Sequence, residues 1–290
     1  MKSQDPNTVG SDANPARAVR VREMQNPLDR MLYHPLSARL ARFLARTPAS
    51  PNMVSVAGGL AIILAGFAYI QPGWPLLAVL GLLIHMSWHV LDGADGDLAR
   101  LTGQASPAGE IVDGLCDYAG HIVLYVLLAA ATFDSIGWTA WLLFGAAGVS
   151  RILQASFHEA QRRQFLDWVY GVPWLRTSLH QTPPTRARRL GHAYLALVNR
   201  LAPGDTHIDQ AIADPARRDA VRADLLTRGW TALAGSPLLG ANYRTLALGA
   251  SMLAGSPLWY VLYEAVILNL LLAHAVRQSQ RNLAAIRAAL

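Results

Sequence analysis

Six apolar runs, separated by short polar breaks, dominate the pattern of this chain. They cover residues 53–70, 74–90, 122–133, 138–153, 245–253 and 258–275. Several approach the roughly 20 residues that a helix needs to cross a bilayer core of about 30 Å, and the shorter runs reach that length if their polar flanks continue the helix. The pattern therefore predicts an all-α integral membrane protein with six transmembrane helices.

Basic residues are absent from three of the breaks, which we expect to be tight turns. These breaks are "QPGW" at 71–74, "FDSIGW" at 133–138 and "AGSPLW" at 254–259. Arginines gather instead before the first run, between residues 162 and 228, and after the last run. The positive-inside tendency then predicts a multi-pass protein of the cell (inner, cytoplasmic) membrane with both termini in the cytoplasm.

Two segments precede the first run. Residues 1–27 have no apolar core and no small-residue cleavage pattern, so we expect a disordered cytoplasmic leader and not a secretory signal. Residues 28–46 combine a hydrophobic helical face with arginines on the opposite face, which predicts an N-terminal amphipathic helix in the headgroup layer. That face holds Leu32, Leu36, Leu40, Phe43 and Leu44. An ordinary soluble amphipathic helix is the alternative.

The chain divides into four predicted parts. After the leader, residues 28–160 hold the amphipathic helix and spans one to four, including the acidic segment described below. Residues 161–237 mix aromatic, basic and breaker residues and are predicted to form a cytoplasmic insertion with amphipathic helices. Within it, Pro215 directly after Asp214 is typical of a helix start. Residues 238–290 hold spans five and six and a cytoplasmic tail.

Composition agrees with a membrane protein, because 52% of the residues are hydrophobic and only 15% are charged. Acidic residues in segment 91–121 nevertheless adjoin some of the most apolar sequence. Helical periodicity places two stripes there, one at the end of span two and one at the start of span three. The first stripe holds Asp92, Asp95, Gly96 and Ala99, and the second holds Gly109, Asp113 and Asp117. The other two acidic residues, Asp97 and Glu110, fall outside both stripes and are expected to be solvated.

Four carboxylates that meet in a partly desolvated place repel one another unless cations neutralise them. A divalent metal site follows, and ligands made only of oxygen favour Mg²⁺ or Mn²⁺, with room for two ions. Cys116 is expected to be a packing residue. His85 and His89, four residues apart on span two, are expected to have structural or hydrogen-bonding roles, with metal binding as the alternative.

The acidic segment resembles the CDP-alcohol phosphotransferase family (CDP-alcohol phosphatidyltransferase class I). It matches the signature D-x2-D-G-x2-A-R-x8-G-x3-D-x3-D at eight fixed positions. These are Asp92, Asp95, Gly96, Ala99, Arg100, Gly109, Asp113 and Asp117. Pro51, Asn52 and Ser55 resemble the family's Pro-Asn-x-x-Thr element, with a serine in place of the usual threonine. The resemblance covers about residues 28 to 160 and then fades.

The resemblance implies an integral membrane enzyme of phospholipid biosynthesis, usually a homodimer with six spans. Such enzymes transfer a phosphate-linked group from a CDP-alcohol to an acceptor alcohol and release CMP. It implies metal ligation by Asp92, Asp95, Asp113 and Asp117, with Asp117 also accepting the proton of the acceptor. CDP-alcohol binding would fall to Asn52, Ser55, Gly96, Ala99, Arg100, Ser106 and Gly109. Gly109 would let span three approach span two, and Arg100 would pair with phosphate or hold an aspartate. The expected partners are the two substrates, the lipid bilayer and a second copy of the chain, with no nucleic acid.

The acceptor is less well defined by the sequence. Arg151, His158 and Arg162 lie where the fourth span should emerge on the side of the signature, and they could bind an anionic acceptor such as inositol phosphate or glycerol phosphate. A basic flank that follows the positive-inside tendency is the alternative. For the donor, CDP-diacylglycerol is the first expectation and a soluble CDP-alcohol remains open.

Two functions from other classes also fit intramembrane carboxylates. A cation or proton transporter would keep such residues in its helices, although no repeat of fixed period supports an inverted-repeat transporter. A noncatalytic membrane scaffold is the second alternative, and intact Asp113 and Asp117 argue against a degenerate enzyme.

Overall fold

The computed structural model describes residues 24–71, 75–172, 204–234 and 236–289. In these ranges the chain is helical and contains no strand, which confirms the predicted all-α class. Most of the predicted leader, up to residue 23, and residues 173–203 of the predicted insertion lie outside the described residues.

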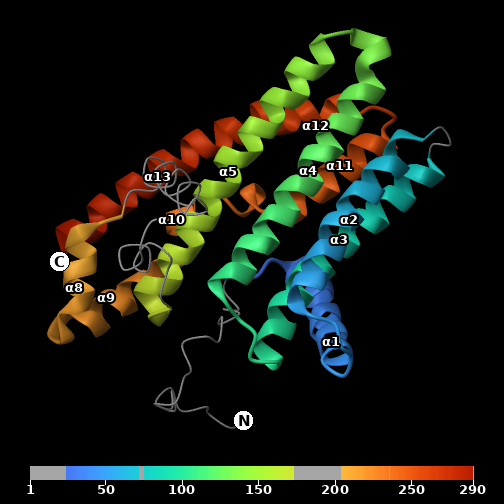
Figure 1. Ribbon diagram of the computed structural model, residues 1–290. Coiled ribbons are helices and arrows are strands. Elements are labelled where there is room, and N and C mark those ends of the chain that lie inside the picture. Colours follow the sequence, from blue (N-terminus) through green and yellow to red (C-terminus); the bar gives the residue numbers. More distant parts are fainter. Residues whose placement is uncertain (1–23, 72–74, 173–203, 235, 290) are drawn as a thin grey trace, which may run out of the picture.

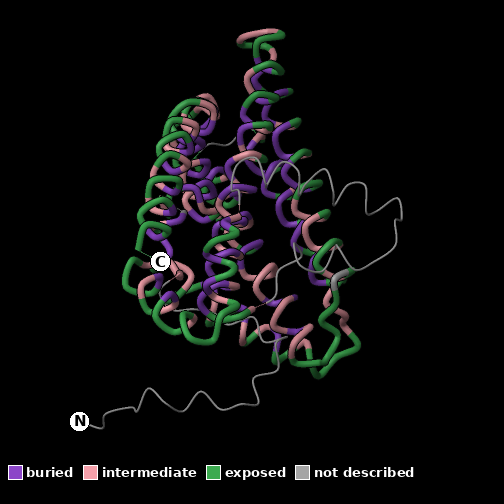
Figure 2. The backbone as a smooth tube through the Cα atoms, turned by 90° about the vertical axis from the view of Figure 1, so that its left-hand side faces the viewer, coloured by how far each residue is buried: buried purple, intermediate pink, exposed green. Residues whose placement is uncertain are grey.

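Five helices in the described ranges are long and apolar enough to cross a membrane. They are α2 (Pro51–Ile70), α3 (Leu76–Leu101), α4 (Pro107–Ile136), α5 (Thr139–Tyr170) and the last run, formed by α12 (Leu258–Leu262), η5 (Tyr263–Ile267) and α13 (Leu268–Ala289). The chain is therefore a multi-pass membrane protein. Buried residues lie on the inner sides of these helices and exposed residues on the outer sides (Figure 2).

The predicted fifth span coincides with a shorter helix. α11 (Ala241–Leu253) has 13 residues, so it extends only about 20 Å at the rise of an α-helix. A short 3₁₀ turn, η4 (Pro237–Leu239), precedes it. α11 packs closely on α3, since a Cβ added at Gly249 would lie 2.5 Å from Leu82. The count of six spans stays a prediction.

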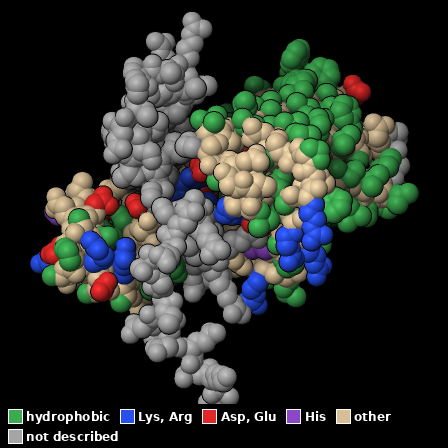
Figure 3. Space-filling view, turned by 60° about the horizontal axis from the view of Figure 1, so that its bottom comes forward, with side chains coloured by type: hydrophobic (Ala, Val, Ile, Leu, Met, Phe, Trp, Pro, Cys, Tyr) green, Lys and Arg blue, Asp and Glu red, His purple; other side chains and the backbone are tan. Residues whose placement is uncertain are grey.

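The N-terminal amphipathic segment forms η2 (Asp29–Tyr33) and α1 (His34–Leu44). The face of α1 that carries the small residues Ser37 and Ala41 packs on α3. There the Ser37 hydroxyl donates to the Val90 carbonyl at 2.9 Å. The apolar residues Leu32, Leu36 and Phe43 point away from the protein and are exposed. In Figure 3, Lys and Arg side chains gather on the end of the molecule turned to the viewer, and hydrophobic side chains cover the far part of the bundle. An interfacial position of α1 remains a prediction that fits this distribution.

The region after residue 160 continues the bundle without a break at the predicted boundary. α5 runs on to Tyr170 and ends where Gly171 adopts the left-handed conformation with φ of 67°. Around this end pack α8 (Thr206–Ala213), α9 (Pro215–Arg228), α10 (Thr231–Ala234) and the end of α13 (Figure 1). They share a second apolar core, which includes Phe165, Trp168, Ile208, Leu225, Trp230 and Leu283.

α2 is the central helix of the region that holds the acidic segment. It packs along both α3 and α4, and its contact with α4 is a backbone contact. A Cβ added at Gly120 would lie 2.9 Å from the carbonyl oxygen of Gly59, and one added at Gly59 would lie 2.9 Å from that of Cys116. This close packing brings the start of α2, the end of α3 and the start of α4 to the same end of the bundle (Figure 1).

Candidate active site

Three of the four predicted metal ligands converge in the structure. One ligand atom each from Asp92, Asp113 and Asp117 lies within 4.8 Å of the others, which is close enough to share a metal ion. Asp95 lies outside this trio. Its Oδ2 accepts a hydrogen bond of 2.5 Å from the hydroxyl of Ser55, and the carboxyl group also interacts with Asp113. The donor set, made of carboxylates only, fits a hard divalent cation.

Helix ends explain why these carboxylates meet. Asp92 and Asp95 lie in the last turns of α3, and Asp113 and Asp117 lie in the first turns of α4. Ser106 caps α4, because its hydroxyl accepts a hydrogen bond of 3.1 Å from the amide of Gly109. Pro107 at the first position of the helix adds to this start signal. The short turn between the two helices then brings the two acidic stripes together, as the spacing predicts.

A cavity of about 360 Å³ opens beside the carboxylates. Its lining includes all seven residues predicted to bind the CDP-alcohol, namely Asn52, Ser55, Gly96, Ala99, Arg100, Ser106 and Gly109, together with Asp95 and Asp113. The volume lies within the range of small-molecule sites, about 300 to 1,000 Å³. Ser50 and Ser106, the N-caps of α2 and α4, also line the cavity. Two helix N-termini therefore flank it, and helix N-termini favour anionic groups such as phosphates.

Two details of the cavity differ from the sequence-based picture. The close approach at Gly109 is toward Ser106 and toward Asn52 on α2, with no atom of span two (α3) among its nearest neighbours within 4 Å. The backbone contact that closes the site joins α2 to α4 at Gly59 and Gly120. The physical reason is that α2 packs along both α3 and α4.

Arg100 holds an aspartate, which is one of the two roles that the sequence leaves open. Its Nη2 donates to Asp97 at 2.6 Å, and the Asp97 side chain retains only 16% exposure. Asp97 is thus an ion-pair partner, and the expectation of a simply solvated charge is wrong for it. Glu110 is more exposed and lies 3.4 Å from Arg163.

Two residues behind Asp117, Trp88 and His121, are absent from the sequence-based site. The indole N–H of Trp88 donates to Asp117 Oδ1 at 2.6 Å, and His121 Nδ1 lies 2.8 Å from the Asp117 carbonyl oxygen. His89 pairs with the Thr245 hydroxyl at 2.9 Å, and the His85 ring packs beside Trp88 and His121. Trp88 and Asp92 are four residues apart, so their spacing places Trp88 on the same face of α3 as Asp92. The pairing of Trp88 with Asp117 depends on how α3 and α4 pack.

The predicted acceptor residues do not form one cluster. Arg151 points to His121 and Tyr260, at 2.7 and 3.5 Å. His158 packs edge-on against Trp230 with ring centroids 5.1 Å apart. Arg162 donates twice to Glu159 at 2.7 Å, and it lies within electrostatic range of Asp92. Two of the three have charge interactions with the carboxylate trio, Arg162 with Asp92 and Arg151 with Asp117.

Comparison with known proteins points to one family. Residues 49–172 match the family model of CDP-alcohol phosphatidyltransferase. A CDP-diacylglycerol–serine O-phosphatidyltransferase of Mycobacterium leprae is 32% identical over 120 residues, which cover 40% of this chain and 37% of the relative. An archaetidylinositol phosphate synthase of Aeropyrum pernix is 34% identical over 97 residues, which cover 31% of this chain and 47% of the relative.

The aligned parts therefore span less than half the length of these two relatives. The family model covers the part of the chain where the carboxylates, the cavity and the caps of α2 and α4 lie together. Residues 49–172 of this chain are a CDP-alcohol phosphatidyltransferase domain.

Proposed function

We propose that the protein transfers a phosphate-linked alcohol from a CDP-alcohol to an acceptor alcohol, with release of CMP, in phospholipid biosynthesis. The observation that carries this proposal is the convergence of Asp92, Asp113 and Asp117 within 4.8 Å, beside a cavity lined by the rest of the signature. The family match of the same residues supports it. A transporter has no comparable support, because both relatives are named as enzymes that make phospholipids.

The carboxylate trio would hold Mg²⁺ or Mn²⁺, and with Asp95 the set has enough oxygen ligands for two ions. Bound divalent cations neutralise the charge of a pyrophosphate group and of a departing phosphate. The chain itself contributes orientation. Residues at the starts of α2 and α4, among them Asn52 and Ser106, line the cavity where the CDP moiety would bind.

Asp117 is the proposed proton acceptor. The hydroxyl oxygen of the acceptor attacks the β-phosphorus of the donor, and the bond from that phosphorus to the CMP oxygen breaks. The proton of the hydroxyl passes to the Asp117 carboxylate, while the electron pair of the broken bond leaves with CMP. The indole N–H of Trp88 donates a hydrogen bond to Oδ1 of this carboxylate and so restrains the orientation of the group.

CDP-diacylglycerol is the proposed donor, and an alcohol that carries a phosphate, such as inositol phosphate or glycerol phosphate, is the proposed acceptor. Arg162, which has a charge interaction with Asp92, is the proposed contact for the acceptor's phosphate. The names of the two relatives differ in the alcohol part, since one names serine and the other names archaetidylinositol phosphate.

The decisive experiment uses the purified full-length chain in lipid nanodiscs. Each CDP-donor is paired with serine, inositol phosphate, inositol and glycerol phosphate, and CMP release is followed with mass detection of the lipid product. We expect release with CDP-diacylglycerol and a phosphorylated polyol, lost with chelator and restored by Mg²⁺ or Mn²⁺. Restoration by zinc alone would contradict the hard-cation assignment. No CMP release from any pair would overturn the transferase function and favour a scaffold, or a transporter if the chain reconstituted in sealed vesicles takes up cations.

We propose that the protein lies in the cytoplasmic membrane with six spans and with both termini in the cytoplasm. We also propose that it forms a homodimer. Exposed positions are available on both predicted sides, with Ser135 near the end of α4 and Ala220 on α9. In a Cys116→Ala background, an impermeant thiol reagent added to intact cells should label Ser135→Cys and not Ala220→Cys. The reverse pattern would overturn the orientation, and a monomer mass in light scattering would contradict the homodimer.

A further inference from the structure

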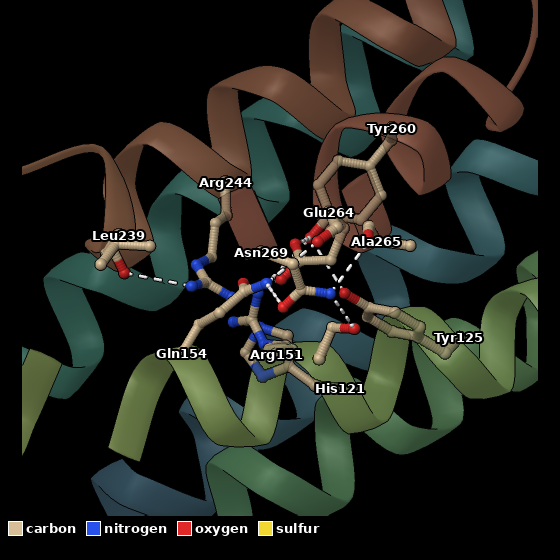
Figure 4. Close-up of polar contacts among 11 residues, drawn as sticks. His121, Tyr125, Arg151, Gln154, Leu239, Arg244, Tyr260, Glu264, Ala265 and Asn269 are labelled. Atoms are coloured by element: carbon tan, nitrogen blue, oxygen red, sulfur yellow. Dashed lines mark hydrogen bonds and ion pairs between the residues drawn. The ribbon is translucent and has the colours of Figure 1, made fainter. Parts of the chain in front are cut away.

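A buried ion pair joins α11 to the last membrane helix, away from the carboxylate trio. Glu264 belongs to η5, a π-helical turn, and its side chain is fully buried. Its Oε1 accepts from Arg244 Nη1 of α11 at 2.5 Å, and its Oε2 accepts from the Tyr260 hydroxyl at 2.6 Å (Figure 4). π-helical turns often mark functional positions. This pair fixes the orientation of the Tyr260 hydroxyl.

The Tyr260 hydroxyl connects this pair to α5 and α4. Arg151 Nη1 donates to it at 3.5 Å, and Tyr125 shares a hydrogen bond of 3.0 Å with it. Arg151 Nη2 lies 2.7 Å from His121 Nε2. Because a guanidinium only donates, Nε2 must be the acceptor, and the proton of a neutral ring then sits on Nδ1. Nδ1–H in turn donates to the Asp117 carbonyl at 2.8 Å, so Arg151 selects the tautomer that this bond needs.

His121 reaches Asp117 by a second route. Its ring packs edge-on against the indole of Trp88, with centroids 4.8 Å apart and planes at 78°. The same indole donates to Asp117 Oδ1 at 2.6 Å. The backbone and the side chain of Asp117 are therefore both held by groups that depend on the position of His121.

Arg151 suits this task by its shape. Within the described residues no carboxylate lies within ion-pair distance of it, and its two nearest polar partners are neutral, a histidine ring and a phenol. A planar guanidinium can bridge two acceptors at a fixed angle, which a lysine ammonium on a flexible stem does not reproduce. Arg151 has longer-range charge interactions with Glu264 and Asp117, whereas its hydrogen bonds go to neutral groups.

We propose that Arg151 is a positioning residue for the transfer reaction. It orients the Asp117 carboxylate by way of His121 and Trp88, and the Arg244–Glu264–Tyr260 group holds Arg151 in place. This inference rests on the proposed function of Asp117 as proton acceptor, and it gives Arg151 a role other than binding the acceptor. Outer groups that orient ligands of a metal site typically change activity by about 10- to 100-fold.

The test is a steady-state comparison of wild type, Arg151→Gln and Arg151→Lys. We expect kcat to fall about 10- to 100-fold in both variants, with KM unchanged for the CDP-donor and for the acceptor. Lysine should not restore kcat, because it keeps the charge and loses the fork. A rise in the acceptor KM with unchanged kcat would overturn the proposal in favour of acceptor binding, and rescue by lysine would reduce the role to charge alone. Tyr260→Phe, a milder change, should lower kcat in the same direction.

Gln154 provides the matched control on the same helix. Its Nε2 donates to the Glu264 carbonyl and to Asn269 at 3.0 and 2.8 Å, so it ties α5 to the last helix without a bond toward Asp117. Gln154→Leu should lower the unfolding temperature and leave kcat near the wild-type value. Equal loss of kcat in Gln154→Leu would show that any loosening of this contact suffices, which contradicts a specific positioning role.

A readout that needs no turnover separates this inference from the proposed function. The indole N–H resonance of Trp88, assigned by its loss in Trp88→Phe, reports the hydrogen bond to Asp117. It should shift in Arg151→Gln and stay in place in Gln154→Leu. If wild type releases no CMP, the transferase function fails, and an unshifted resonance in Arg151→Gln independently overturns the positioning role.

Discussion

The helix bundle holds two polar regions that are built in opposite ways. On one side, the carboxylate trio gathers negative charge beside a cavity, with its ligand atoms within 4.8 Å of one another. On the other side, the Arg244–Glu264 pair and its neighbours pair charge with charge deep in the helix bundle. The first region gathers like charges that a positively charged ligand would neutralise, whereas the second pairs its carboxylate with a guanidinium of the protein. Changes in the first should therefore act mainly on turnover, whereas breaking the Arg244–Glu264 pair should act mainly on stability.

The largest expected effect is at Asp92 or Asp113. Asparagine at either position should reduce CMP release to background and weaken CDP-donor binding, because the trio loses a metal ligand. Thermal stability without metal should stay the same or rise, since repulsion among the carboxylates falls. Calorimetric donor binding and an unfolding scan check both outcomes. Wild-type turnover in Asp113→Asn would remove the shared metal site from the mechanism.

Asp117→Asn should lower kcat by about 10² to 10⁴, the usual cost of losing a general base. Much of the affinity for the CDP-donor should remain, because the other carboxylates carry most of the metal. Steady-state kinetics and donor binding test this. Loss of donor binding as complete as in Asp92→Asn would show that Asp117 is chiefly a ligand.

Glu264→Gln addresses the opposite region. It leaves the Arg244 guanidinium buried without a counterion, and breaking a buried pair in this way typically costs about 3–5 kcal/mol of stability. Denaturant or thermal unfolding in detergent measures the change. The control is Asp224→Asn, which breaks the half-exposed pair with Arg228 and should cost at most about 1 kcal/mol. Equal effects of the two changes would contradict the contrast between buried and exposed pairs.

The smallest effect is expected at the contact between α2 and α4. Gly120→Ala would place a Cβ 2.9 Å from the Gly59 carbonyl oxygen, and overpacking of this kind costs about 1–3 kcal/mol. Activity should fall as well, because α2 carries Ser55, the partner of Asp95. Gly145→Ala on α5, with no neighbour within 4 Å, should keep activity and stability. An unaffected Gly120→Ala protein would show that the helices separate without harm.

Several features follow from the sequence because they depend on local periodicity. The two acidic stripes lie on α3 and α4 as the spacing predicts, since residues three and four apart share a helical face. Helix starts at α4 and α9 follow their capping residues, Ser106 and Asp214, each followed by proline. The seven predicted substrate residues line one cavity. Five of them lie near the carboxylates along the chain, whereas Asn52 and Ser55 reach the cavity because α2 packs along α3 and α4.

Other features depend on contacts between helices, which periodicity does not encode. The bond from Trp88 to Asp117 joins residues 29 positions apart, and the ion pair of Arg244 with Glu264 requires the packing of α11 against the last helix. Arg151 illustrates the difference, since its place near the signature is predictable and its partners, His121 and Tyr260, are not. A helix determines which side chains share a face, but the burial of whole faces against one another determines which of them meet.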